Sequence, residues 1–156
     1  MIERFARFQR LSSFERGIVL EAAGGLLATW LGLRLIGFRR WERVLAIFAP
    51  PANATALAPP ALEQESALSI ARLQAAAARN VLFEPNCLEQ SLVLWWLLRR
   101  RGIAADLRIG ARKDSDRFEA HAWVEFGSQV LNDAGAEHRH FVPFEQPILS
   151  MEARIE

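Results

Sequence analysis

The chain has 156 residues, of which 51% are hydrophobic and 24% charged, so it can bury the core of one soluble domain of ordinary size. Its formal net charge is only +1, and its aromatic residues are not interleaved with the basic ones as in base-stacking proteins, so we expect no nucleic-acid partner. A single cysteine excludes an internal disulfide framework and indicates a reducing compartment, which predicts a cytoplasmic protein.

The N-terminal region predicts neither a secretion signal nor a membrane span. Charged residues continue past the point where the apolar core of a signal peptide would begin. The apolar segment 17–38 has the length of a membrane span, but Glu21 and Arg34 interrupt it and leave a run well short of the roughly 20 residues that a bilayer requires. We therefore expect a packed or interfacial helix, and we do not expect membrane contact.

Helical patterns occupy the first half of the chain. Ser12 and Ser13 are candidate N-caps of a first helix, and Gly37 breaks its pattern. The prolines of the Pro/Ala-rich segment 49–60 prevent a helix from continuing through it, so it predicts a linker. A strongly helix-favouring segment follows. The predicted helices cover 13–35, 39–48 and 61–80.

The stretch NCLEQSLVLWWLLRRRG, residues 86–102, has the signals of a complete helix. Pro85 fixes its entry, Asn86 is a good N-cap, and Cys87 falls on the first turn. Arginines near its end complement the negative end of the helix macrodipole, and Gly102 terminates the helix. We expect its core face to consist of Leu88, Leu92, Trp95 and Trp96.

From Gly102 onward the hydrophobic period changes from 3.6 to 2, which predicts strands. A turn over 113–116 and the pair Gly127-Ser128 separate them, and we expect a short last strand in the tail after residue 140. Helices followed by an antiparallel meander give an α+β fold. The main strands are predicted over 103–112, 117–126 and 129–133.

Cys87 is either a small buried apolar residue or a nucleophile. A thiol on the first turn of a helix lies near several unpaired backbone N–H groups and the positive end of the macrodipole. Both features favour the thiolate, which is the reactive form, and the same N–H groups can serve as an oxyanion hole in acyl transfer. The position alone leaves both interpretations open.

His121 and Asp133 are the candidates for a general base and for the residue that orients it. His121 lies on the more polar face of its strand between two alanines, which leave room for an approaching helix end. A two-residue loop, Gly127-Ser128, would put Asp133 on the face opposite His121. A triad that includes Cys87 therefore requires an odd loop or a bulge.

A metal site is the weaker alternative for these residues. The Glu-His-Arg-His run at 137–140 offers a plausible pair of ligands, but the chain has no second cysteine and no close ligand spacing. We therefore expect no metal and no other cofactor, and we place His138 and His140 on the surface. The metal site would have used Cys87, His121, His138 and His140.

Two stretches resemble a known family. NCLEQSLVLWWLLRRRGIAADLRIGARK and FEAHAWVEFGSQVLND are similar to parts of the lasso-peptide biosynthesis B2 proteins, leader peptidases of the transglutaminase-like (papain-like) cysteine-protease superfamily. The resemblance covers about residues 62–145. It implies a catalytic-cysteine helix packed against an antiparallel sheet, with Cys87 as the nucleophile, His121 as the histidine and Asp133 as the aspartate of a triad.

By this resemblance the chain divides into an N-terminal helical region with the Pro/Ala linker, 1–60, and a protease domain, 61–156. Such a protease cuts the leader from a ribosomally made precursor peptide, and a separate ATP-dependent cyclase then forms the macrolactam. Relatives often work with a small leader-binding B1 protein, which the region 1–60 does not resemble, so a partner in trans is implied. Gln90 stands where many relatives carry a basic residue, which puts one substrate or partner contact in doubt.

Two other functions remain open on the sequence. A transglutaminase-like acyl transferase would form the same acyl-enzyme and resolve it with an amine in place of water. A non-catalytic adaptor in a peptide-modifying complex would use the apolar segment 17–38 as a docking helix or a membrane-surface helix. Product mass separates transfer from hydrolysis, and thiol labelling tests the adaptor, because a buried structural Cys87 would resist alkylation.

Overall fold

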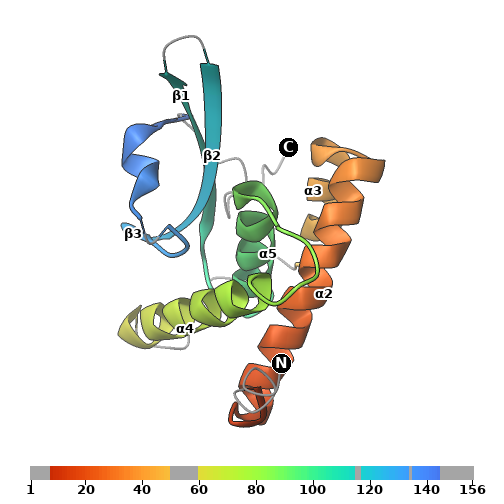
Figure 1. Ribbon diagram of the computed structural model, residues 1–156. Coiled ribbons are helices and arrows are strands. Elements are labelled where there is room, and N and C mark those ends of the chain that lie inside the picture. The colour runs from red at the N-terminus through yellow and green to blue at the C-terminus, as the bar shows by residue number, and fades with distance from the viewer. Residues whose placement is uncertain (1–7, 50–59, 115–116, 134, 145–156) are drawn as a thin grey trace.

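The α-helices pack on one side of an antiparallel sheet, and a short 3-10 helix lies on the other side (Figure 1). This arrangement confirms the predicted α+β class. The computed structural model describes residues 8–49, 60–114, 117–133 and 135–144. The linker predicted over 49–60 lies almost wholly outside the described residues. The elements are α2 (Ser13–Leu35), α3 (Phe38–Ile47), α4 (Pro60–Ala78), α5 (Cys87–Arg99), β1 (Asp106–Asp114), β2 (Arg117–Phe126), β3 (Gln129–Val130), the 3-10 helix η1 (Glu137–His140) and β4 (Val142–Pro143).

The N-terminal helices begin where the sequence predicts. Ser12 caps α2 in a capping box with Glu15: the Glu15 backbone N–H donates to the Ser12 hydroxyl (3.2 Å), and the Ser12 N–H donates to the Glu15 carboxylate (2.8 Å). Gly37, with a φ of 77°, turns the chain directly from α2 into α3. Both helices share one hydrophobic core with α4, α5 and the sheet.

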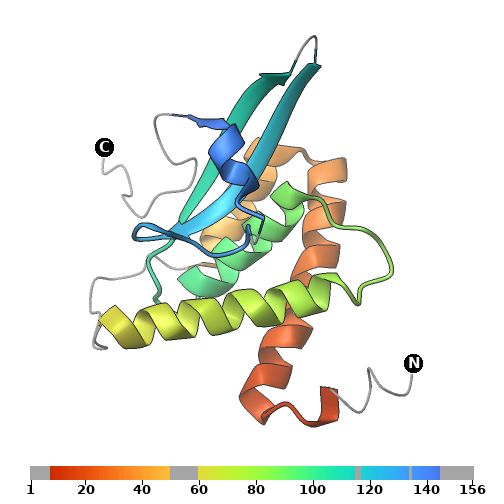
Figure 2. The same cartoon turned by 60° about the vertical axis from the view of Figure 1, so that its left-hand side comes forward.

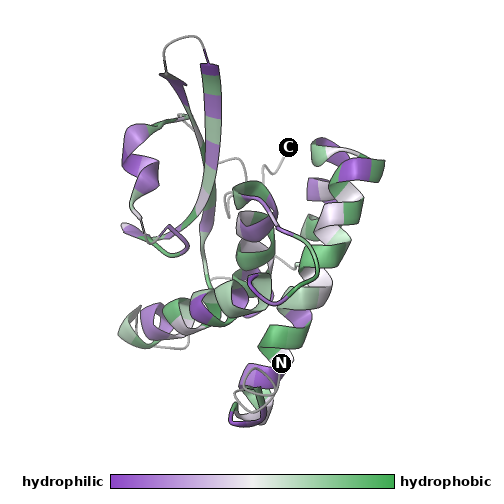
Figure 3. Ribbon diagram, in the orientation of Figure 1, coloured by the Kyte–Doolittle hydropathy of each residue, from purple (hydrophilic) through white to green (hydrophobic). Residues whose placement is uncertain are grey.

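α2 buries one face and exposes the other. By length and mean hydropathy (1.4) it could cross a membrane, but core helices of soluble proteins meet the same test. Here it packs against α4 and α5, and Figure 3 shows the apolar residues along it. Its buried residues are Ile18, Ala22, Leu26, Thr29 and Gly32, and its exposed leucines are Leu20, Leu27, Leu31 and Leu35.

α5 is the central helix, and its core contacts extend beyond the four residues predicted as its core face. α2 and α4 pack against it from one side and β2 from another, so most of its circumference is covered (Figures 1 and 2). Of the four residues predicted as core, Leu92 and Trp95 are fully buried, and Leu88 and Trp96 are partly buried against the core. The fully buried apolar residues are Leu92, Val93, Leu94, Trp95, Leu97 and Leu98.

The sheet has the strand order β3-β2-β1-β4, with a long β1–β2 hairpin. β1 begins at Asp106 and not at residue 103 as predicted, because the Ile103 N–H still bonds the Leu98 carbonyl at the end of α5 (3.0 Å). Val124 is fully buried in the core, whereas Phe118 on the same face is 80% exposed. The hairpin tip extends beyond the helices, which explains that exposure (Figure 1).

Two glycines of α2 make a matched pair for testing the α2–α3 packing. A Cβ added to Gly32 would overlap the ring of Trp41, whose indole N–H donates to the Thr29 hydroxyl (3.2 Å). A Cβ added to Gly24 would meet nothing within 4 Å. We predict that Gly32→Ala lowers the free energy of unfolding by about 1–3 kcal/mol, whereas Gly24→Ala raises it by about 1 kcal/mol. Urea unfolding measures both, and shifts in the same direction would contradict this packing.

Candidate active site

Cys87 is the first residue of α5 and is partly exposed. Asn86 caps the helix as predicted, and Glu89 completes a capping box that the sequence analysis did not identify. The Glu89 N–H donates to the Asn86 side chain, and the Asn86 N–H donates to the Glu89 carboxylate, each at 2.9 Å. These bonds fix the turn that carries the thiol.

The capping box leaves two amides of the first turn for a ligand. The N–H of Gln90 already donates to the Asn86 carbonyl (3.0 Å), and the N–H of Glu89 is used by the cap. Within the described residues, no acceptor bonds the backbone N–H of Cys87 or Leu88. Two free amides next to a thiol are the donors that an oxyanion hole requires.

One turn further along α5, Ser91 ties the helix to the sheet. The fully buried Ser91 hydroxyl donates to the carbonyl of Ala122, the neighbour of His121 (3.0 Å), and accepts from the side-chain amide of Asn132 (2.8 Å). The oxygen of the same amide accepts from the Val124 N–H (2.8 Å). The sequence analysis identified neither Asn132 nor Ser91, because their partners are distant in the chain.

Asp133 reaches His121, but not in the way the sequence required. Gly127 and Ser128 form the even, two-residue loop, with Phe126 opposite Gln129. A continued strand would have turned Asp133 away from His121. However, β3 ends at Val130 and not at residue 133, because the Asn132 side chain takes the place of a backbone partner for β2. The requirement for an odd loop or a bulge is therefore wrong, and Asp133 Oδ2 lies 3.7 Å from His121 Nε2.

His138 is the closer partner of Asp133, which corrects its placement as a surface residue. The His138 backbone N–H donates to Asp133 Oδ2 (2.6 Å), and its Nδ1 lies 2.7 Å from the same oxygen. Its ring also packs near Trp123, with centroids 5.8 Å apart. His140 is exposed, as predicted. The contact between His138 and Asp133 depends on a turn through Ala136, which has a left-handed backbone conformation. No local sequence pattern predicts that turn.

Aromatic rings surround the imidazole of His121. Trp123 is stacked at 6.0 Å and Phe141 is tilted at 5.3 Å, measured between ring centroids. Gly110 of β1, paired with His121, leaves the space for them, since a Cβ there would lie 2.9 Å from Trp123 and 3.0 Å from Phe141. His121 Nε2 is buried without a hydrogen-bond partner among the described residues, and the Asp133 carboxylate lies 3.7 Å from it.

The pKa of Asp133 lies below its ordinary value of 3.8. Burial of the carboxyl acts to raise the pKa, but hydrogen bonds from the backbone and ring of His138 and from the backbone of Glu137 outweigh it, and the nearby charge of His121 adds to them. Asp133 is thus held as an anion next to the imidazole of His121. An anion in this place favours the protonated imidazole that forms during acyl transfer.

Cys87 and His121 lie on adjacent elements. Val124 faces α5 in the core, so the alternation of β2 turns His121 to the other face with Trp123. The described residues include no hydrogen bond between the Cys87 thiol and His121. The structure therefore brings His121 to Asp133, but among the described residues it shows no hydrogen bond from either of them to Cys87.

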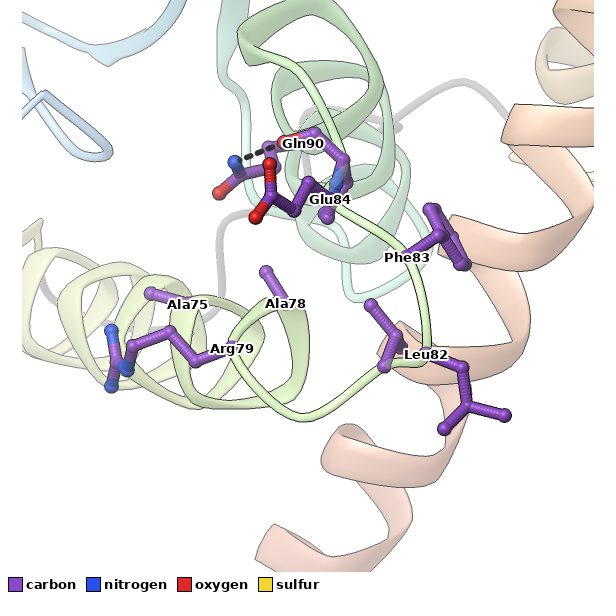
Figure 4. Close-up of a pocket in the computed structure, with 9 residues that line it drawn as sticks. Ala75, Ala78, Arg79, Leu82, Phe83, Glu84 and Gln90 are labelled. Atoms are coloured by element: carbon purple, nitrogen blue, oxygen red, sulfur yellow. Dashed lines mark hydrogen bonds between the residues drawn. The ribbon is translucent and has the colours of Figure 1, made fainter.

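A cavity of about 700 Å³ opens beside the start of α5 (Figure 4). Gln90, on its wall, donates from its side-chain amide to the Pro85 carbonyl (2.8 Å), so the wall adjoins the Cys87 turn. The size suits a ligand or a peptide segment. Its lining includes Ala75, Ala78, Arg79, Phe83, Glu84 and Gln90. None of the three triad candidates lines it, so the cavity borders the site and is not the site itself.

Metal ligands do not gather here. Across the described ranges, no group of three or more His, Cys, Asp or Glu side chains is arranged to hold a metal ion. Asp133 instead uses its lone pairs on His138 and faces His121.

A family model described as the Transglutaminase-like superfamily matches residues 32–146, well over half of the chain, including Cys87, His121 and Asp133. The chain belongs to this superfamily. The match confirms the superfamily predicted from the sequence motifs, and it agrees with a helix that begins at the cysteine and packs on an antiparallel sheet. The matched region begins within α2, so it takes in α3 as well.

One curated relative is the Microcin J25-processing protein McjB of Escherichia coli. It is 45% identical to the chain over 53 residues, which are 34% of this chain and 24% of the relative. The similarity thus spans about a quarter of the relative's length. No solved structure matches the chain.

The depressed pKa of Asp133 predicts a pH dependence of stability. Because the folded pKa lies below the unfolded value, the ionised carboxylate stabilises the fold above about pH 4, and this contribution is lost as the pH falls through the folded pKa. Asp133→Asn should lower the free energy of unfolding at pH 7, and its difference from the wild type should shrink below pH 4. Urea unfolding from pH 7 to pH 3 measures this.

Asp106 is the matched control of opposite sign. Burial raises the pKa of Asp106, although Arg108 partly offsets this. Asp106→Asn should therefore stabilise the protein at neutral pH relative to acid pH. A constant difference between Asp133→Asn and wild type across the whole pH range would contradict the account of Asp133.

Proposed function

We propose that the protein is a cysteine endopeptidase that removes the leader from a ribosomally made lasso precursor peptide. The observation that carries the proposal is the Cys87 thiol at the capped start of α5, beside two free backbone amides. One turn further along the helix, Ser91 hydrogen-bonds the carbonyl of Ala122, the residue after His121. Membership of the Transglutaminase-like superfamily and similarity to a protein named for processing microcin J25 support it. The resemblance of its motifs to B2 proteins supports the substrate class.

In the first half of the proposed reaction, the Cys87 thiolate attacks the scissile carbonyl of the precursor. The free N–H groups of Cys87 and Leu88 donate to the oxyanion that forms. His121 then donates a proton to the leaving amine, which departs as the new N-terminus of the core peptide. The leader remains on Cys87 as a thioester.

In the second half, water releases the leader. Asp133 faces Nε2 of His121, so Nδ1 is the nitrogen that takes the proton of the thiol and, later, that of the attacking water. Hydrolysis of the thioester gives a leader carboxylate and restores the Cys87 thiol. The freed amine of the core is the group that a separate ATP-dependent cyclase would use.

In this proposal, a second protein binds the precursor peptide together with this chain. We propose a separate leader-binding B1 protein as the partner that presents the precursor, in the cytoplasm, where a lone cysteine remains reduced. The cavity beside Gln90 is open and adjoins the Cys87 turn, so it suits a peptide segment next to the cleaved bond. Gln90 itself is held by the Pro85 carbonyl and presents its amide oxygen there.

Acyl transfer to an amine is the second candidate, because the superfamily is named for transglutaminase chemistry. It uses the same thioester and differs only in the group that attacks it. The mass of the released fragment decides between them. Hydrolysis adds the mass of water across the cleaved bond, whereas transfer joins the leader to an amine.

We predict that Cys87→Ala and His121→Ala each lower precursor cleavage by at least about 1000-fold, because nucleophile and base act as a unit. Mass spectrometry of the precursor, with the leader-binding partner present, measures the rate. Gln64→Ala is the control: it removes only an exposed hydrogen bond to Gln129 (2.6 Å) and should cleave normally. Wild-type cleavage by Cys87→Ala would refute the mechanism.

A further inference from the structure

A buried carboxylate lies on the same helical turn as the proposed nucleophile. Glu89 is only 2% exposed, and it stands two residues after Cys87. One of its oxygens accepts the N–H of Asn86, the residue before the thiol (2.9 Å). Glu89 therefore caps the helix, but its negative charge also opposes a thiolate on that turn, and burial strengthens the opposition.

Arg34 of α2 supplies the compensating charge. Its guanidinium donates to the other oxygen of Glu89 (3.1 Å) and to the Trp30 carbonyl (3.2 Å), and it lies 4.2 Å over the ring of Trp30. These contacts fix one end of an otherwise half-exposed side chain. The positive charge is thus held against the first turn of α5 by a helix more than fifty residues earlier in the chain.

The same part of α2 also holds the segment that leads into the site. The ring of Trp30 packs against Phe83, with centroids 5.6 Å apart. Phe83 lies in the connection between α4 and α5, beside α2 (Figure 4). Trp30 and Arg34 are one turn apart, so a single face of α2 contacts both the approach to Cys87 and the turn that carries it.

We propose that Arg34 is a positioning residue for Cys87: by pairing with Glu89 it cancels the buried charge of the helix cap and keeps the thiol reactive. The inference rests on the proposed function only in taking Cys87 as the nucleophile. It makes α2 part of the catalytic unit, although this helix contributes no group to the triad. It also explains why an arginine interrupts the apolar segment 17–38.

Alkylation tests this without any peptide substrate, because Cys87 is the only cysteine in the chain. Iodoacetamide reacts with the thiolate, so its rate at pH 7 reports thiol reactivity. We expect Arg34→Met to slow alkylation about 3- to 10-fold, as a single uncompensated charge within one helical turn would. Arg34→Lys keeps the charge and should stay within about twofold of the wild type.

The double variant separates charge from packing. Glu89→Gln keeps an oxygen for the Asn86 N–H, since glutamine also serves in a capping box, but it removes the negative charge. Arg34→Met/Glu89→Gln should therefore recover alkylation to within about twofold of the wild type. Alkylation that stays as slow as in Arg34→Met would show that Arg34 acts through packing or access, and it would overturn the proposal. So would an unchanged rate in Arg34→Met.

Arg101→Met is the matched control. Arg101, at the other end of α5, forms an ion pair with Glu21 of α2 (3.0 Å). The substitution Arg101→Met therefore removes an ion pair to the same helix, but far from Cys87. It should leave the alkylation rate unchanged, and an equal slowing would overturn the proposal. Circular dichroism and thermal unfolding confirm that each variant is folded. Failure of precursor cleavage alone would refute the protease and leave this result standing.

Discussion

The burial of α5 is the constraint on which the rest of the structure depends. A helix packed on several sides cannot shift along its axis, so its first turn keeps a fixed place relative to β2. The cap of Asn86 and Glu89 then determines which backbone amides stay free beside Cys87. The hydrogen bond from Ser91 to the Ala122 carbonyl sets the helix against the strand that carries His121. The position of the Cys87 thiol and of the free amides beside it therefore depends on the packing of the whole helix.

The acid–base side of the site depends on a short strand. If β3 continued past Val130, the alternation of side chains would turn Asp133 away from His121. The Asn132 side chain ends the ladder by taking the Val124 N–H, and the chain then bends so that Asp133 meets His121 and His138 together. The Asn132 side chain thus hydrogen-bonds α5 through Ser91 and β2 through Val124, and Asp133 is the next residue in the chain.

Local sequence signals predicted where the helices begin and end, whereas features that depend on contacts between distant residues could not be predicted. Caps, glycines and the change of hydrophobic period are encoded within a few residues, so the start of α5 at Cys87 and the ends of α2 could be predicted. The end of β3 depends on Asn132 meeting β2, and the partner of Asp133 depends on the turn before His138, neither of which has a local pattern. For the same reason Arg34 was noticed only as a charge in an apolar segment. Its partner Glu89 is 55 residues away.

The central claim is that Cys87 carries the leader as a thioester, and trapping this species tests it most directly. Precursor peptide, leader-binding partner and enzyme would be mixed, quenched in acid within the first turnover, and measured by intact-protein mass spectrometry with peptide mapping. The account predicts a mass increase equal to the acylated leader fragment, located on the peptide that contains Cys87. Turnover without any adduct, or an adduct on another residue, would contradict it.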